Sequence, residues 1–190
     1  MVATAEKKYT VEEYLALENT AEVRHEFVHG KRIPMPGESI IANVICLNLA
    51  FLLRQALHGK GFTVVAHDVR LIIDVNGIYR YPDVAMTETA SLTDTHAITQ
   101  PILLAEVTSK NSAPTDQGTK LLEYTQLPSL QHYLIISQSE YLVEVYSRRA
   151  DEWRFSYYMN PTDVIELTDL GISIAIKDLY EGVAFAAKDK

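Results

Sequence analysis

A carboxylate closes one of the most apolar stretches of this chain. Ile102 to Ala105 are all apolar, and Glu106 follows them directly. A charge at the end of a buried strand is costly unless a partner compensates it. Lys110 and Lys120 follow Glu106 in the sequence. An ion pair with either lysine, or a bound cation, could supply the compensation, and the residue types alone leave these alternatives open.

A second carboxylate, Asp83, follows a proline in the stretch "YPDVAM". Proline cannot donate to a strand ladder, so the strand is expected to be irregular or at an edge there. If Asp83 and Glu106 meet at one end of neighbouring strands, their like charges require a shared proton or a cation. Carboxylate oxygens with open water positions suit Mg²⁺ or Mn²⁺ rather than zinc.

Lys120 could complete such a site. Asp116, Lys120 and Tyr124 are four residues apart, which places them on one helical face. Their helix follows the Glu106 strand directly, so Lys120 can fold back over the strand end. An ammonium there could position a water and stabilise developing negative charge. The plainer interpretation is a surface ion pair of small energetic value between Asp116 and Lys120.

The elements that must position these residues begin with a short helix, a hairpin and a long helix. Thr10 and Glu13 have the capping-box spacing of a short first helix. A hairpin about His29-Gly30 is expected next. From Ser39 to Leu57 apolar residues repeat at three and four positions, which predicts a long helix with a buried face. Leu47 and Phe51 widen that face, so cover on more than one side is expected.

The rest of the chain is mostly strand. Asn76-Gly77 is a strong hairpin signal, and "PILLAEV" lacks alternation, as a strand covered on both faces does. A helix is expected from about Pro114 to Leu127, with Ser112 or Thr115 as its cap. Further strands are predicted in "HYLIIS", "YLVEVYSR", "EWRFSYYM" and "GISIAI". The order predicts an α/β protein with a mixed, mostly antiparallel central sheet flanked by helices. Residues 1–190 are expected to form a single domain, with residues 1–8 as a flexible tail.

Several of these stretches together resemble a known family. They are "YTVEEYLAL", "RHEFVHGKRIPMPG", "YPDVAM" and "LLAEVTSKNSAPTDQGTKLLEYTQLPSLQHYLII". The chain is similar to the PD-(D/E)XK nuclease-like superfamily, and within it to a bacterial branch of uncharacterised, Uma-type restriction endonucleases. The resemblance implies a restriction-endonuclease-like fold and a Mg²⁺- or Mn²⁺-dependent endonuclease that hydrolyses phosphodiester bonds, with DNA as its substrate.

The resemblance also assigns roles to individual residues. Asp83 would be the metal-binding acid of the first half-motif and Glu106 the acid of the second, with the backbone carbonyl of Val107 as a third metal ligand. Lys120 would be the catalytic lysine, displaced from the strand to the helix, and Glu26 an additional acid facing the site.

The chain also departs from the family pattern. Thr108 stands where the wider superfamily has its lysine. Lys110, in the loop, is a rival to Lys120 because it replaces what is often a proline. Ala42 stands where many relatives carry a histidine, which leaves the long helix without an expected catalytic role. Ser109 matches a serine that would brace the loop.

Composition limits the alternatives. The formal net charge of −8 gives poor general affinity for nucleic acid, and it favours a rival hypothesis in which the domain is catalytically inactive and serves binding or assembly. The single cysteine, Cys46, cannot form an internal disulfide and is expected to be a core residue. The six histidines show no zinc-motif spacing.

Location and assembly are also expectations from the sequence. No apolar run reaches the length of a membrane span and the first residues lack a signal-peptide pattern, so we expect a cytoplasmic protein with no membrane partner. The surplus apolar surface of the long helix predicts a homodimer.

Overall fold

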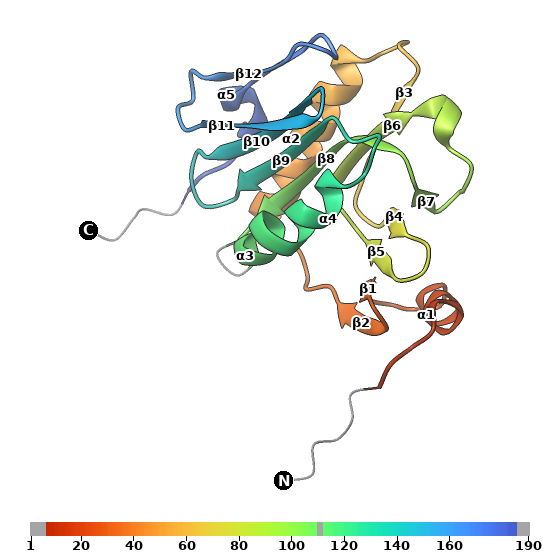
Figure 1. Ribbon diagram of the computed structural model, residues 1–190. Helices are drawn as coiled ribbons and strands as arrows, with labels where there is room; N and C mark the ends of the chain where they lie inside the picture. Colours follow the sequence, from red (N-terminus) through yellow and green to blue (C-terminus); the bar gives the residue numbers. More distant parts are fainter. Residues whose placement is uncertain (1–6, 110–111, 186–190) are drawn as a thin grey trace.

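Helices lie on both faces of a central sheet (Figure 1). The structure, a computed structural model, describes residues 7–109 and 112–185. The helices are α1 (Val11–Glu18), α2 (Ile40–Ala56), α3 (Ala113–Thr115), α4 (Leu121–Thr125) and α5 (Ile176–Leu179), with a 3-10 turn η1 (Thr89–Ser91) and a π-helical turn η2 (Asp116–Lys120). The predicted class, an α/β fold with mostly antiparallel strands, is confirmed.

The central sheet has six strands in the order β11-β10-β9-β8-β6-β3. Their bounds are β3 (Phe62–Ala66), β6 (Val84–Glu88), β8 (Pro101–Thr108), β9 (His132–Ser137), β10 (Val143–Arg149) and β11 (Glu152–Tyr158). Only the β8–β9 pair is parallel. The crossover from β8 to β9 carries η2 and α4, as a parallel connection requires.

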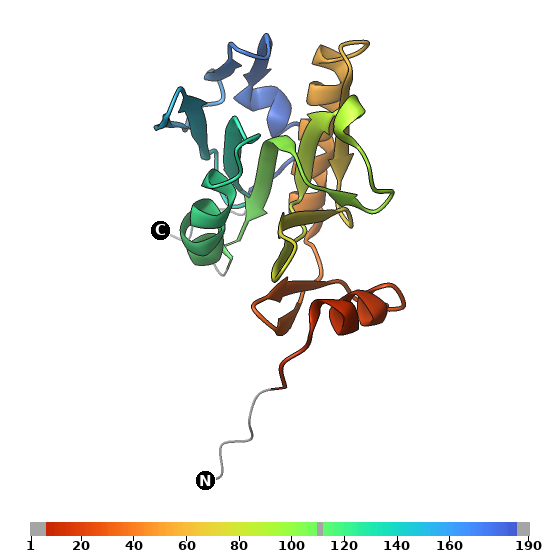
Figure 2. The same cartoon turned by 45° about the vertical axis from the view of Figure 1, so that its right-hand side comes forward.

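Every residue of β8 is buried, as the lack of alternation predicted. Leu103 and Ala105 pack in the core cluster that contains the buried face of α2, whereas Leu104 packs with Tyr124 of α4. The two helices therefore cover opposite faces of the sheet, which is visible in the turned view (Figure 2). Glu106 falls on the α4 face by the same alternation.

A second sheet of five strands, in the order β2-β1-β5-β4-β7, packs beside the first. Its strands are β1 (His25–Val28), β2 (Lys31–Pro34), β4 (Arg70–Asp74), β5 (Ile78–Arg80) and β7 (Ala97–Ile98). The expected return strand after Asn76-Gly77 breaks at residues 81–83, so β5 belongs to this sheet and β6 to the central one. The break coincides with Pro82, and it is the irregularity that the sequence predicted.

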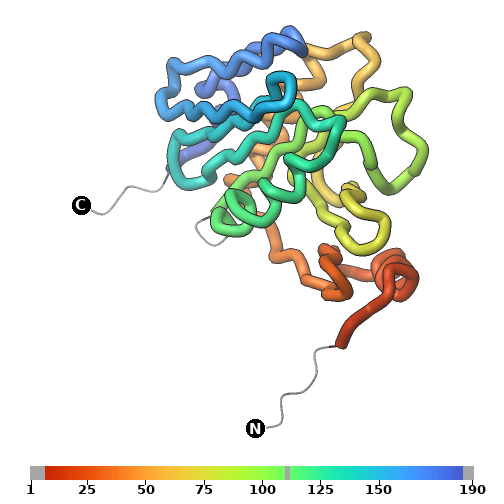
Figure 3. The backbone as a smooth tube through the Cα atoms, in the orientation of Figure 1, coloured from red at the N-terminus to blue at the C-terminus, as the bar shows by residue number. Residues whose placement is uncertain are grey.

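The N-terminal segment extends from one end of the molecule (Figure 3). The capping box of Thr10 and Glu13 forms as predicted and starts α1. The hairpin of β1 and β2 turns at His29 and Gly30, whose φ angles are 48° and 89°. Strand β1 also pairs with β5, which attaches this segment to the rest of the chain and directs Glu26 toward the central sheet.

The predicted helix from Pro114 to Leu127 is present but uneven. It runs as α3, η2 and α4 and ends at Thr125, with Pro114 in its first turn. Ser112 occupies the cap position without a capping hydrogen bond from its side chain. The π-helical turn carries Asp116 and Lys120, both of which are buried. Such turns widen the helix locally, and they are frequent at functional sites.

The helix α2 begins after Ser39, whose side chain accepts a hydrogen bond from the N–H of Ala42. Helix α2 is covered on more than one side, as expected, because the central sheet, β13 and α5 all pack against it, but Leu47 and Phe51 themselves are 55% and 63% exposed. Cys46 is fully buried in the core, as expected.

The C-terminal part adds the small sheet of β12 (Val164–Leu167) and β13 (Ile172–Ala175). The predicted N-terminal tail, residues 1–8, falls mostly outside the described residues. Within residues 7–109 and 112–185, no helix is both long and apolar enough to cross a membrane.

Candidate active site

Glu106 lies in a buried polar cluster between β8 and the helical segment that covers it. Glu106 is only 4% exposed. The hydroxyl of Tyr124 donates to Oε1 of Glu106 at 2.8 Å, and Nζ of Lys120 lies 3.0 Å from the same oxygen. Burial raises the pKa of Glu106 to about 8, although the ammonium of Lys120 opposes this shift. The expected lysine partner is therefore Lys120, yet it does not fully compensate the buried carboxylate.

Asp83 sits in the break between β5 and β6. Its Oδ2 accepts a hydrogen bond of 2.6 Å from the backbone N–H of Val107, the residue after Glu106. Burial raises the pKa of Asp83 to about 6, while the Val107 hydrogen bond and Lys120 act in the opposite direction. Repulsion from Asp83 in turn contributes to the raised pKa of Glu106. The two predicted acids are thus neighbours at one end of the adjacent strands β6 and β8, in the interior of the central sheet.

Lys120 is surrounded by carboxylates. Besides Glu106, its Nζ lies 3.1 Å from Oδ1 of Asp116 and 3.4 Å from Oε1 of Glu26. Only 8% of the residue is exposed. Burial lowers the pKa of Lys120, but the three acids outweigh it and hold the pKa above its usual range, so the ammonium stays charged. The alternative of a surface ion pair between Asp116 and Lys120 is wrong, because both residues are buried.

Glu26 is held in place by a buried arginine. The Nη1 of Arg80 lies 2.6 Å from Oε2 of Glu26, and Arg80 also makes two contacts of 2.8 Å with the carboxylate of Glu123. Arg80 itself is 3% exposed. This arrangement fixes one oxygen of Glu26 on Arg80 and leaves the other for Lys120.

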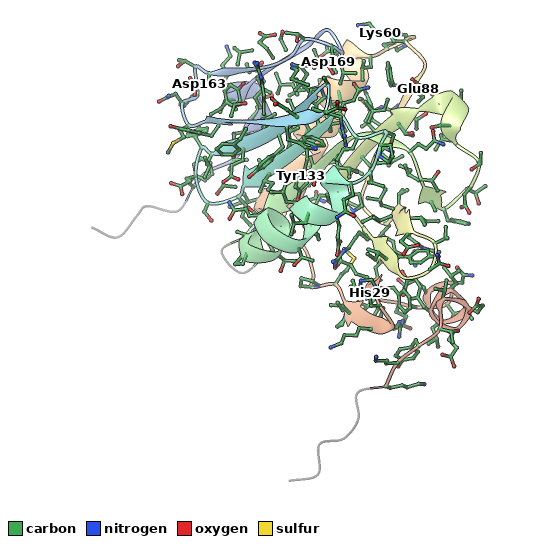
Figure 4. The ribbon with its side chains drawn as sticks, viewed as in Figure 1. His29, Lys60, Glu88, Tyr133, Asp163 and Asp169 are labelled. Carbon is green, nitrogen blue, oxygen red and sulfur yellow. The ribbon has the colours of Figure 1, made fainter. Side chains whose placement is uncertain are left out.

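The helical segment is anchored on the sheet beneath it. The hydroxyl of Tyr133, on β9, donates to the backbone carbonyl of Asp116 at 3.2 Å, and the rings of Tyr133 and Tyr124 meet edge to face at 5.1 Å. Figure 4 labels Tyr133 beside this segment. In the loop before it, Ser109 and Ser112 exchange hydrogen bonds from backbone to side chain, consistent with the bracing role expected for Ser109. Lys110 lies outside the described residues.

The residues present fit a divalent cation. The polar cluster contains five carboxylates and two cationic side chains among the described residues, namely Asp83, Glu106, Glu26, Asp116, Glu123, Lys120 and Arg80. Because the N–H and C=O of one residue in a strand point to the same neighbour, the carbonyl of Val107 also lies on the Asp83 side. Two carboxylates and a carbonyl are hard oxygen donors of the kind that Mg²⁺ or Mn²⁺ accepts.

Sequence reasoning missed Arg80 and Glu123. A signal for Arg80 did exist in the strand pairing. In the antiparallel register of β1 and β5, Phe27 is opposite Tyr79, so the next position outward sets Glu26 opposite Arg80. No local pattern indicates Glu123, because only the path of the helical segment brings it to Arg80.

Comparison with known proteins identifies the class first. A crystal structure from Anabaena variabilis ATCC 29413, titled as a putative nuclease belonging to DUF820, superposes with a TM-score of 0.76 at 16% sequence identity and covers 90% of this chain and 97% of that one. The two proteins therefore share a fold.

The sequence then gives the family. The Uma2 family, described as "Putative restriction endonuclease", matches residues 11–177. Two uncharacterized proteins of Synechocystis sp. (strain ATCC 27184 / PCC 6803 / Kazusa) are similar over most of their length. The protein sll1609 is 35% identical over 176 residues, which are 90% of this chain and 99% of that protein, and slr1290 is 32% identical over 180 residues, 94% of each. The chain belongs to the Uma2 family.

Proposed function

We propose that this protein is a metal-dependent endonuclease that hydrolyses phosphodiester bonds in DNA. The observation that carries the proposal is the position of Lys120, whose ammonium contacts Glu106 at 3.0 Å beside Asp83, at the edge where β6 and β8 meet. Family membership and the nuclease title of the fold neighbour agree with it.

Asp83, Glu106 and the carbonyl of Val107 would hold one Mg²⁺ or Mn²⁺. When bound, that ion would supply Lewis-acid polarisation of a phosphoryl oxygen and a water of lowered pKa. Val107 donates a hydrogen bond to Asp83 and Tyr124 donates one to Glu106, and these bonds restrict the orientation of each carboxylate.

Lys120 would stabilise the negative charge that develops as phosphorus is attacked. Glu106, Glu26 and Asp116 together hold the pKa of Lys120 above its usual range against burial, so the ammonium stays protonated. Glu26 would act by positioning this ammonium, and Arg80 by positioning Glu26.

Conversion of supercoiled plasmid to nicked and linear forms in Mg²⁺ tests the proposal. Wild type should cut, and Glu106→Gln and Lys120→Ala should each lose at least about a hundredfold in rate, the scale on which loss of one charge-stabilising group is felt. Lys110→Ala should retain most of the activity. Glu88→Gln is a matched control, because Glu88 is exposed and lies at the far end of β6 from Asp83 (Figure 4).

The rival function is a catalytically inactive domain used for binding or assembly. The net charge of −8 favours it, because acidic proteins have low affinity for nucleic acid away from a metal site. Isothermal calorimetry separates the two functions. Mg²⁺ or Mn²⁺ binding that Asp83→Asn removes supports the nuclease, and a wild type that binds neither ion supports the inactive domain.

We also infer a homodimer formed through α2. Ile40, Leu47 and Phe51 are 85%, 55% and 63% exposed, and their spacing of seven and four residues sets them along one side of the helix. A two-fold axis through this stripe would cover it with its own copy. Two active sites in one assembly would also suit cutting of both strands of a duplex. The cytoplasmic location stays a prediction from the sequence.

A further inference from the structure

A second group of metal-ligand side chains lies on the side of Asp83 that faces α2. Glu38, in the segment before α2, Cys46 on α2, His67 after β3, and Asp83 each offer one ligand atom, and these atoms all lie within 4.8 Å of one another. The four residues come from separate parts of the chain. The hairpin-like pairing of β3 with β6 and the packing of α2 on the sheet bring them together.

Two contacts within this group have the length expected between ligands of one metal ion. Oε1 of Glu38 lies 3.6 Å from Sγ of Cys46 and 3.6 Å from Nδ1 of His67. Ligand atoms of a tetrahedral zinc ion are about 3.3–3.8 Å apart, as follows from metal–ligand bonds of about 2.0–2.3 Å. Both contacts are therefore of the right length without further movement.

His67 is held firmly beside Asp83. Its backbone N–H donates to the carbonyl of Asp83 at 3.0 Å, and its φ angle is 53°. The Nε2 atom of His67 is buried and has no hydrogen-bond partner among the described residues. The imidazole thus has one nitrogen, Nδ1, directed to the carboxylate of Glu38 and one buried nitrogen without a partner among the described residues.

The donor set determines which cation fits. A thiol, an imidazole and two carboxylates are the ligands that zinc takes in proteins, whereas Mg²⁺ binds oxygen and does not take sulfur. We propose that Glu38, Cys46, His67 and Asp83 form a zinc site adjacent to the catalytic acids. The cation binds as the thiol of Cys46 releases its proton to solvent, so that the thiolate becomes a ligand.

This site goes beyond the nuclease function and shares only Asp83 with it. The carboxylate of Asp83 has two oxygens, and Oδ2 is directed to the N–H of Val107. A zinc ion on the α2 side would fix the orientation of Asp83 from the opposite side. Cys46, which the sequence indicates only as a core residue, would then connect α2 to the edge of the sheet where the catalytic acids lie.

Cobalt substitution tests the proposal because Cys46 is the only cysteine in the chain. Thiolate–Co²⁺ coordination gives a charge-transfer band in the near ultraviolet, so this band can arise only from Cys46. We expect wild type to bind one Co²⁺ with this band and with the intense visible bands of a tetrahedral ion, and Zn²⁺ to displace both. A wild type that binds no Co²⁺, or binds it without the charge-transfer band, overturns the proposal and leaves a hydrogen-bonded cluster only.

Variants assign the ligands independently of nuclease activity. Cys46→Ser should lose the charge-transfer band. His67→Asn, chosen because asparagine tolerates a positive φ, should weaken Co²⁺ binding by more than the about 10–100-fold that loss of an outer-shell partner costs. Glu106→Gln should keep the band, which separates this site from the catalytic one. Zn²⁺ should raise the Tm of wild type and of Glu106→Gln. An unchanged spectrum in Cys46→Ser would contradict the assignment.

Discussion

Replacement of Lys120 by methionine should destabilise the metal-free protein strongly. The side chain is 10% exposed, and its ammonium lies within 3.4 Å of three carboxylates. Methionine fills a similar volume, so the change removes the charge with little loss of packing. Removing one partner of a buried ion pair typically costs about 3–5 kcal/mol, because the other charges stay buried and uncompensated. We expect a decrease of this size in the free energy of unfolding.

The loss should depend on pH in a defined direction. Attraction to Lys120 lowers the pKa of Glu106, which burial has raised to about 8. Without Lys120 this pKa rises further, so the folded protein resists deprotonation of Glu106 while the unfolded chain does not. Below about pH 8 Glu106 stays protonated in both folded proteins, so the loss caused by Lys120→Met should grow as pH rises above 8, where wild type ionises Glu106 and the folded variant resists doing so. A pure packing defect would give a loss that does not change with pH.

Urea unfolding in EDTA, followed by circular dichroism, measures both effects. Lys60→Met is the matched control, because Lys60 is exposed and should change the stability by less than about 0.5 kcal/mol. Adding Glu106→Gln to Lys120→Met should restore part of the loss above pH 8, since it removes the carboxyl group whose ionisation the folded variant resists. If Lys120→Met loses less than about 1 kcal/mol, or loses the same amount at every pH, the electrostatic account of this pocket is wrong.

Three further predictions concern other parts of the molecule. Arg80→Met should reduce plasmid cleavage but leave the Mn²⁺ affinity within a few-fold of wild type. The reason is that Arg80 acts on Lys120 through Glu26. Abolished Mn²⁺ binding in calorimetry would contradict this. Burial lowers the pKa of His132, so below pH 6.5 the unfolded chain binds a proton more readily than the folded protein does, and the free energy of unfolding should decrease as pH falls. Urea titrations of His132→Gln should show a smaller decrease. Phe51→Glu should convert a dimer to a monomer in light scattering, and a wild-type monomer would refute the α2 interface.

Much of the fold could be predicted because its signals are local. The capping box at Thr10 and the unbroken apolar run before Glu106 each specify one element without reference to distant residues, and both elements occur as expected. The partition of strands into three sheets could not be predicted in this way. It depends on the break at Pro82, where the sequence indicates an irregularity but not the direction that the chain takes after it.

The site residues likewise separate into those that local spacing predicts and those that depend on distant strand pairing. Helical spacing placed Asp116, Lys120 and Tyr124 on one face, and the structure brings all three to Glu106 or its lysine partner. Arg80 was missed because it meets Glu26 across strands that are 54 residues apart in sequence. His67 was missed because its position beside Asp83 follows from the pairing of β3 with β6, and histidine spacing along the chain carries no trace of it.

Surface prediction was least reliable. The apolar periodicity of α2 correctly identified a buried face, yet it also indicated cover for Leu47 and Phe51, which are exposed. Apolar periodicity predicts which side chains tend to be buried, but it does not indicate whether the same chain or a second copy covers them.

The central claim is that Asp83 and Glu106 hold one divalent cation at the end of the strand pair β6 and β8. Anomalous diffraction from crystals soaked in Mn²⁺ tests it most directly. The account predicts an anomalous peak within bonding distance of both carboxylates and of the Val107 carbonyl, absent in crystals of Glu106→Gln treated in the same way. A wild-type map with no peak between Asp83 and Glu106 would contradict it, whether or not the protein cleaves DNA at the same Mn²⁺ concentration.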